Sequence, residues 1–344
     1  MNAKFSFFLM IYFSIYFSNS VLCQIGGENT YEFVNLSSSA RLLSQGNVLL
    51  NIFDDDVNLS YCLPSLNNKK MNNQFSINYT NYFADIDFGS IIYGLKSDRT
   101  ENITLALKYI NYGKFDETDQ FGNIIGEFSA GEYLFSASTL LLRKKKCSLG
   151  YSLKLIYSNF YNVNSYGFLA DFSFTYEIKQ NRILYSFLMK NLGSQIKSYN
   201  NKENMPFELK MGLTSRLENA PFRISILLNH IEDWNLFYER DVDSNENSIL
   251  NDYNNNSLNL RNEIISHINI GSEILFSDNF NFRVGYNFRL SQELGLDLYN
   301  RGVGLSYGFL LKIKKFQFNF ARVIYHAFGP LSTISLVSNL VNKN

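Results

Sequence analysis

Residues 280–290 of this chain read FNFRVGYNFRL. Phe280 and every second residue from there to Leu290 are apolar, whereas the residues between them are Asn, Arg or Gly. Because successive side chains of a strand point to opposite faces of a sheet, the segment predicts a strand with one apolar face and one polar face. A single strand of this kind fits any half-buried sheet, so its meaning depends on how often the pattern returns.

The pattern returns along most of the chain after residue 74. Residues 303–313 give a second clean example, and we count about fourteen strand-like segments under the period-two template. Many have roughly the 9–11 residues that a tilted strand needs to cross a bilayer. The predicted strands are Gln74–Tyr82, Ile86–Leu95, Asn102–Tyr112, Gly131–Leu142, Cys147–Tyr157, Tyr166–Ile178, Arg182–Leu192, Phe207–Leu217, Phe222–His230, Glu263–Leu275, Phe280–Leu290, Arg301–Ile313, Phe316–Val323 and Thr333–Leu340.

The connections between these strands alternate in length. The short ones are Arg143–Lys146, residues 179–181, Glu218–Pro221, Ser277–Asn279 and Lys314–Lys315, and the long ones are Gly113–Ala130, Gly193–Pro206, Ile231–Asn262 and Ser291–Asn300. Short turns at one end and long loops at the other are typical of outer-membrane barrels. A soluble β-sandwich, the alternative, needs no such asymmetry. We therefore predict an all-β fold in which residues 74–344 form a transmembrane antiparallel β-barrel of about fourteen strands.

The first 73 residues divide into two parts. Residues 1–23 are interpreted as a signal peptide, because Lys4 precedes an apolar run from residue 5 to residue 17. Lipidation of Cys23 is the alternative, but the residues before it, Val21 and Leu22, are larger than a lipidation site prefers. Residues 24–73 are expected to fold into the lumen as a plug or to line the periplasmic mouth. Their acidic run, residues 54–56, is interpreted as a solvated turn, with a calcium loop as the sharper alternative.

Composition narrows the classes of function. The 344 residues contain 31 Lys and Arg against 31 Asp and Glu, so no net field favours nucleic acid. After the leader, no stretch approaches the ~20 continuous apolar residues of a membrane helix. We expect an exported protein of the Gram-negative outer membrane that contacts lipid through its strands. The turn Arg143–Lys146 is interpreted as periplasmic, with a contact to anionic lipid or to a periplasmic partner as the alternative.

A search for chemistry finds little. The three histidines are His230, His267 and His326. Ser266 is adjacent to His267, but neighbours in a strand point to opposite faces, so the two do not form a catalytic pair. We expect no catalytic residues, no metal site and no cofactor. Cys62 and Cys147 are interpreted as two unpaired thiols, with a disulfide as the alternative.

The long connection Ile231–Asn262 is the candidate partner-binding loop. It contains side chains of the types that dominate binding interfaces, namely Trp234, Leu236, Phe237, Tyr238 and Arg240. Trp234 is the only tryptophan of the chain. Its alternative location is the aromatic girdle at the membrane interface, since it follows closely on a predicted strand.

The segment after the leader, QIGGENTYEFVNLSSSARLLSQGN, resembles the mature start of the PorQ family of the type IX secretion system in Bacteroidetes. The residues that carry the resemblance are Gly26, Gly27, Tyr31, Phe33, Val34, Asn35, Leu36, Ala40 and Arg41. Only Gly46 remains of a later glycine pair, with Asn47 beside it. Residues 114–133, 205–226 and 280–289 extend the similarity, so it covers most of the mature chain.

The resemblance implies a barrel similar to FadL and PorV, with the N-terminal segment as a plug. It also implies a non-enzymatic role: anchoring a PorZ-like surface protein within an attachment complex that includes PorU and PorV. The alternative function is FadL-like transport of hydrophobic small molecules, although the expected inward stripe, with Arg283 and Arg289 among its members, suits such a ligand poorly. An outer-membrane hydrolase is the third possibility.

Overall fold

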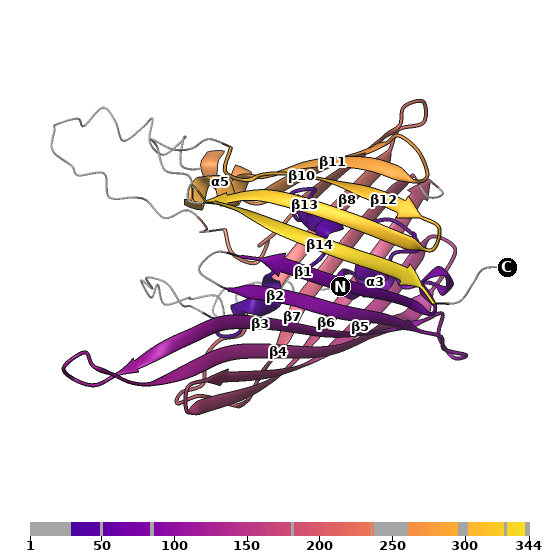
Figure 1. Ribbon diagram of the computed structural model, residues 1–344. Coiled ribbons are helices and arrows are strands. Elements are labelled where there is room, and N and C mark those ends of the chain that lie inside the picture. Colours follow the sequence, from indigo (N-terminus) through magenta and orange to yellow (C-terminus); the bar gives the residue numbers. More distant parts are fainter. Residues whose placement is uncertain are drawn as a thin grey trace, which may run out of the picture.

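The computed structural model describes residues 29–48, 51–82, 86–179, 182–234, 236, 261–294, 302–326 and 329–340. Within them, fourteen antiparallel strands form a closed barrel, in which each strand pairs with its sequence neighbours (Figure 1). The first and last strands close it, with Gln74 opposite Asn339 and Asn81 opposite Ser332. The predicted fold class and strand number are therefore confirmed. The strands are β1 Gln74–Asn81, β2 Asp87–Leu95, β3 Ile103–Thr118, β4 Ile124–Arg143, β5 Cys147–Phe160, β6 Val163–Lys179, β7 Ile183–Lys197, β8 Glu208–Arg216, β9 Phe222–Leu228, β10 Ile268–Leu275, β11 Phe280–Asn287, β12 Leu305–Ile313, β13 Phe316–His326 and β14 Gly329–Asn339.

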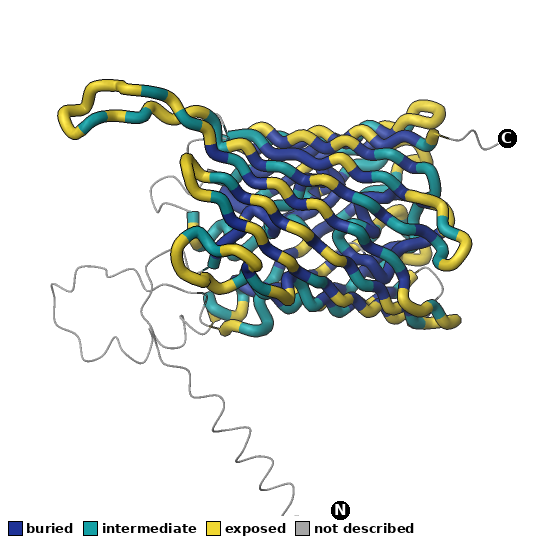
Figure 2. Tube along the Cα trace, turned by 90° about the horizontal axis from the view of Figure 1, so that it is seen from below, coloured by how far each residue is buried: buried dark blue, intermediate teal, exposed yellow. Residues whose placement is uncertain are grey.

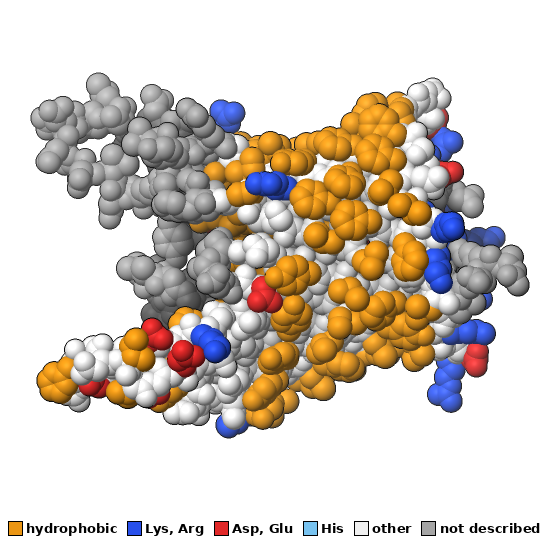
Figure 3. Space-filling model, in the orientation of Figure 1, with side chains coloured by type: hydrophobic (Ala, Val, Ile, Leu, Met, Phe, Trp, Pro, Cys, Tyr) orange, Lys and Arg blue, Asp and Glu red, His pale blue; other side chains and the backbone are white. Residues whose placement is uncertain are grey.

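Side chains alternate between an outer apolar belt and a polar lumen (Figures 2 and 3). In β5, Leu153 and Leu155 are about half exposed, whereas Ser152 and Lys154, which alternate with them, are buried. The same holds in β11, where Arg283 is fully buried and Val284 faces outward. An apolar outer surface of this extent suits hydrocarbon, in which the barrel satisfies its backbone hydrogen bonds internally. None of the helices in the described part of the chain is long and apolar enough to span a membrane.

The N-terminal segment fills the lumen as a plug of short helical turns. These are η1 Glu32–Asn35, α2 Ala40–Leu43, α3 Val57–Cys62, η2 Pro64–Leu66 and η3 Lys69–Met71. The plug bonds to strands around the whole barrel: Ala40 N–H donates to Ser335 Oγ of β14 (2.9 Å), and Ser65 N–H donates to Ser173 Oγ of β6 (2.8 Å). Small lumen residues permit this approach. A Cβ at Gly150 would lie 2.3 Å from the Pro64 carbonyl carbon, so β5 and η2 touch backbone to backbone.

Buried charges hold the plug at the turn end, the end with the short connections. Arg41 donates to Asp54 Oδ2 (2.7 Å) and Asp56 Oδ2 (3.1 Å). Burial alone would raise the pKa of Asp54, but the charge of Arg41 outweighs it and lowers that pKa below its usual range. The expectation of a solvated turn at residues 54–56 is wrong for Asp56, which is 1% exposed, whereas Asp54 keeps about a third of its side chain exposed at the turn end. Both carboxylates face Arg41 because they compensate its buried guanidinium.

A second ionic cluster lies on the barrel wall beside Arg41. Glu273 of β10 is fully buried and accepts from Arg283 Nε (2.7 Å) and from Arg223. Arg283 Nη1 also donates to Asn319 Oδ1 of β13 (2.8 Å). One carboxylate thus binds two guanidiniums from adjacent strands. In the segment quoted first, Arg283 of the polar face therefore has a structural role, since it is bonded to residues of β10 and β13.

Several predicted boundaries are wrong; β7, for example, runs to Lys197 instead of Leu192, and β12 begins at Leu305 instead of Arg301. Three differences change the kind of element. The strand predicted to run to Leu290 ends at Asn287, and α5 Phe288–Leu294 follows. Residues 261–266 are helical, so β10 begins at Ile268. The predicted loop Gly113–Ala130 is mostly strand, because β3 and β4 continue past the barrel as a two-stranded arm that projects at the loop end, the end with the long connections (Figures 1 and 2). In each of these places, alternation with period two is not enough to distinguish the observed element from the elements next to it.

We expect Glu273→Ala to destabilise the barrel by about 3–5 kcal/mol, because it leaves the buried Arg283 and Arg223 without their carboxylate. Thermal unfolding of the purified protein in detergent, followed by the mobility of folded and unfolded forms on gels, measures this.

The matched control is Glu218→Ala, which removes the half-exposed partner of Arg182 at a turn. It should cost no more than about 1 kcal/mol. Equal effects of the two substitutions would contradict a special role for the Glu273 cluster.

A loop-end cavity and a projecting hairpin as candidate functional site

A cavity of about 890 Å³ opens above the plug at the loop end of the barrel. Its lining comes from the plug, from α5, from the residues that follow β9, and from β2, β7, β8, β10, β11, β13 and β14. One part is apolar and the other is rich in carboxylate and amide groups. The apolar residues include Leu36, Leu43, Phe88, Val323 and Leu331, and the polar residues include Glu32, Asn35, Glu208, His230 and Glu232. Such a mixed lining suits an amphiphilic or peptide-like ligand better than a purely apolar one.

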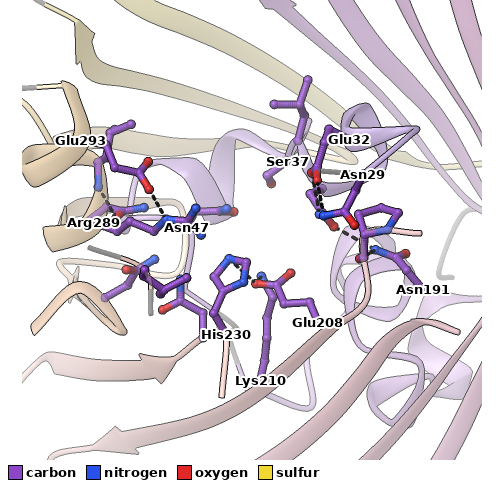
Figure 4. Close-up of a pocket in the computed structure, with 18 of the residues that line it drawn as sticks. Asn29, Glu32, Ser37, Asn47, Asn191, Glu208, Lys210, His230, Arg289 and Glu293 are labelled. Atoms are coloured by element: carbon purple, nitrogen blue, oxygen red, sulfur yellow. Dashed lines mark hydrogen bonds and ion pairs between the residues drawn. The ribbon is translucent and has the colours of Figure 1, made fainter. Parts of the chain in front are cut away.

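His230 is the centre of the polar side (Figure 4). Its Nε2 lies 3.3 Å from Glu208 Oε1 and its Nδ1 lies 3.2 Å from Glu232 Oε1. Lys210 Nζ also binds Glu208 Oε1, at 2.8 Å. When both ring nitrogens carry protons, the imidazole donates to both carboxylates and joins β8 to the chain that follows β9. In this network His230 contacts the carboxylates of Glu208 and Glu232, and these contacts hold the cavity wall together.

Unusual backbone conformations gather at this cavity. Among the described non-glycine residues, seven have positive φ, and Asn47 (59°), Asn191 (62°) and His230 (52°) line the cavity. Asn and His tolerate the left-handed region better than most residues, yet it still costs free energy. Strain of this kind persists where the surrounding structure fixes it, and it is common at binding sites.

The N-terminal sequence motif places its residues around the cavity floor. Asn35 Oδ1 accepts from Lys190 Nζ and from Asn191 Nδ2, both at 2.9 Å. Lys108 Nζ donates to the carbonyls of Phe33 (2.7 Å) and Leu36. Tyr31 is buried with its hydroxyl on Ser165 Oγ, while Ala40 and Arg41 hold α2 against the wall as described above. Gly26 and Gly27 lie outside the described residues. The motif thus consists mainly of residues that dock the plug.

A small inner cavity of about 60 Å³ continues from the floor between plug and wall. It shares Asn35, Leu36, Ser37, Asn47 and Lys210 with the loop-end cavity. A recess of about 260 Å³ at the turn end shares no lining residue with either. The plug therefore separates the two ends of the lumen in this structure.

Two of the predicted partner-binding residues can be placed. Trp234 is 56% exposed and its ring lies 4.7 Å from that of His267, centroid to centroid. Leu236 lines the loop-end cavity. Phe237, Tyr238 and Arg240 lie outside the described residues. Of the candidate partner-binding residues, the structure places Leu236 at the cavity, and of the N-terminal motif it places Asn35 and Leu36 there. The wall residues that complete the cavity, such as Glu208, Lys210 and His230, were not singled out together from the sequence.

The projecting hairpin of β3 and β4 is a second candidate surface. Its turn is ordered, because Asp119 Oδ1 accepts from the backbone N–H groups of Phe121 and Asn123, both at 2.8 Å. Below the turn, the rings of Phe115 and Phe128 stack at 5.3 Å. The turn presents three strongly exposed apolar side chains: Phe121 at 88%, Ile124 at 65% and Ile125 at 63%. Large apolar side chains held in water on a rigid arm indicate a contact surface.

The described residues offer little for catalysis. They contain no group of three or more His, Cys, Asp or Glu that could hold a metal ion. His267 Nδ1 contacts the Asn229 carbonyl at 2.8 Å, while the neighbouring Ser266 donates to the Glu263 carbonyl. Ser291 accepts from the Tyr286 hydroxyl. None of these contacts joins a serine to a histidine.

The comparisons with known proteins concern the fold. No protein-family model matches the sequence, and no curated protein does. The TodX deltaS2S3 mutant, a monoaromatic hydrocarbon channel, matches with a TM-score of 0.50 at 12% identity, covering 88% of this chain and 98% of that one. The Pseudomonas putida toluene transporter TodX gives 0.47 at 11% (88% and 97% covered), and a Pseudomonas aeruginosa FadL homologue gives 0.48 at 8% (89% and 99% covered). The chain is a β-barrel of the outer-membrane type, and its fold is similar to that of FadL-type barrels.

The two cysteines of the described barrel and plug give a test of the inner cavity. Both are free, and Cys62 lines that cavity. Burial raises the pKa of the Cys62 thiol to about 11, so at pH 8 only about one thiol in a thousand is ionised. In the mature chain we expect a water-soluble maleimide to label a Cys62→Ser variant, through Cys147, much faster than a Cys147→Ser variant, through Cys62. If neither cysteine of the unreduced wild type reacts and both react after reduction, the two form a disulfide and the prediction is wrong.

Proposed function

We propose that this chain is a non-enzymatic outer-membrane anchor of the type IX secretion system, similar to PorQ, which holds a PorZ-like surface protein. The observation that supports this role best is the rigid hairpin with Phe121, Ile124 and Ile125 exposed at its turn. A barrel that only admits a small molecule has no need of such an arm. The plugged lumen agrees with a role in which the barrel fixes a partner at the membrane, as part of a complex with PorU and PorV.

The sequence segments that resemble the PorQ family are the second support. The residues of the N-terminal segment dock the plug, whereas residues 114–133 form the end of β3, the turn and the start of β4, and so include the projecting hairpin. A partner with basic groups beside an apolar pocket would complement the hairpin. Its described residues from 114 to 127 include four acidic side chains, Asp116, Glu117, Asp119 and Glu127, against one base, Lys114.

The second candidate function is transport of a hydrophobic or amphiphilic small molecule. The solved structures with a similar fold support this second function, since they are described as a hydrocarbon channel and a toluene transporter. The apolar part of the loop-end cavity, with Leu43, Phe88 and Val323, supplies a surface for such a ligand. The buried ion pairs of Arg41 and Glu273 below it argue against a straight apolar passage. Passage would require the plug to move.

The anchor role predicts that a surface protein is recovered with the barrel after extraction in mild detergent, in roughly equal amount. Phe121→Ser combined with Ile125→Ser should reduce this recovery at least about tenfold, because these side chains lie at the centre of the contact. The control is Trp234→Ser, at the rival surface, which should retain the partner. Recovery of the wild-type barrel alone, with surface cargo still processed in a deletion strain, would reject the anchor role.

The transporter role predicts something different from the same preparation. Mass spectrometry of material extracted from the purified wild type should then show a stoichiometric small amphiphile. A Leu43→Asp variant, with a charge on a partly exposed side chain in the apolar part of the cavity, should lose it while the barrel still folds. If no such molecule is recovered and added hydrophobic compounds do not compete for the cavity, transport is rejected.

A further inference from the structure

The inner cavity has an excess of positive charge. Four lysines point into this region of the lumen, and two of them have carboxylate partners: Lys154 binds Asp171 Oδ2 at 2.5 Å, and Lys210 binds Glu208 Oε1 at 2.8 Å. Lys108 is bonded to backbone carbonyls of the plug. Lys190 has the amide oxygen of Asn35, at 2.9 Å, as its polar partner. Glu132, the next carboxylate on the wall, accepts from the hydroxyl of Tyr112.

Unused hydrogen-bonding groups lie in the same cavity. Ser39 is 97% buried, and neither its hydroxyl nor that of Ser37 has a hydrogen-bond partner. Both serines belong to the plug and line the inner cavity together with Lys154, Lys190 and Lys210 of the wall. Asp171 also lines this cavity, but it is bonded to Lys154, as Glu208 is to Lys210, so the four lysines face two carboxylates that are already paired. A surplus of ammonium groups and buried hydroxyls without partners each cost free energy. One occupant that accepts hydrogen bonds and carries negative charge would satisfy both.

We propose that the inner cavity binds a small monovalent anion of the size of chloride, held by the Lys190 ammonium and the hydroxyls of Ser37 and Ser39. The cavity, of about 60 Å³ against about 890 Å³ for the loop-end cavity, is of a size for a small ion. Lys210 and Asn47, which line the larger cavity (Figure 4), also line the inner one, so the anion has a route from the loop end. This site goes beyond the proposed function and depends on neither candidate role.

The anion would join the plug to the barrel. Ser37 and Ser39 belong to the plug, whereas Lys190 belongs to β7. Binding to the folded form alone stabilises a protein according to ligand concentration. Exchange of chloride for an anion too large to enter should therefore loosen the plug. The deep position of the site, beyond the cavity floor, distinguishes it from lysines at the turns, which water and salt reach freely.

The test compares thermal unfolding in sodium chloride and in sodium gluconate at equal ionic strength. We expect the wild-type midpoint to be at least about 2 °C higher in chloride. Lys190→Met should lose this difference, and the milder Ser39→Ala should reduce it. The matched control is Lys312→Met, which removes a lysine near the turn end, 3.9 Å from Asp55, and should keep the chloride response.

Crystals soaked in bromide locate the ion. Anomalous density beside Lys190 Nζ in the wild type, absent from Lys190→Met, supports the site. A chloride response that is missing in the wild type, or that is equal in the wild type and Lys190→Met, overturns the proposal. So does bromide density only at exposed lysines, which would mean an adventitious ion only. None of these outcomes affects recovery of a surface protein, so failure here and failure of the anchor role are distinguishable.

Discussion

The closure of β1 on β14 is the constraint on which the rest of this structure depends. In hydrocarbon no water can satisfy an open strand edge, so all fourteen strands have to bond in one ring. Closure fixes the width of the lumen, and the lumen then has to be filled. The plug fills it, and the small residues Gly150, Ser173 and Ser335 on the wall permit the contact. Charge on the inner face becomes acceptable because each guanidinium of the Arg41 and Glu273 clusters has a carboxylate beside it.

Much of the fold could be predicted from the sequence because the membrane simplifies the pattern. A strand with lipid on one side and a polar lumen on the other alternates with period two, as residues 147–157 and 303–313 do. The sequence of such a segment therefore indicates which face each side chain occupies. The pattern is insufficient where this contrast ends. Residues 113–130 leave the membrane, so both faces of the hairpin meet water and its strands resemble a loop. Phe288 and Leu290 keep the parity of β11, yet they belong to α5, since aromatic residues also suit a helix that packs over the rim.

The candidate site was harder to predict than the fold. Leu236 lines the cavity and belongs to a loop that stands out by residue type. The floor of the cavity combines Asn35 of the plug, Lys190 of β7 and Lys210 of β8, and no local pattern relates residues so distant in sequence. The acidic residues 54–56 show the same limit. Whether an aspartate is solvated or paired depends on Arg41, whose side chain the fold brings to Asp54 and Asp56.

The bond between Ala40 N–H and Ser335 Oγ has a consequence for biogenesis. It joins α2 to β14, the strand that closes the barrel on β1, so α2 cannot reach its final position until β14 is in place. The plug also binds strands on every side, which makes later threading into a finished ring sterically difficult. The N-terminal segment therefore has to be enclosed while the strands close around it. A chain truncated before β14 would lack the Ser335 hydroxyl to which this segment binds.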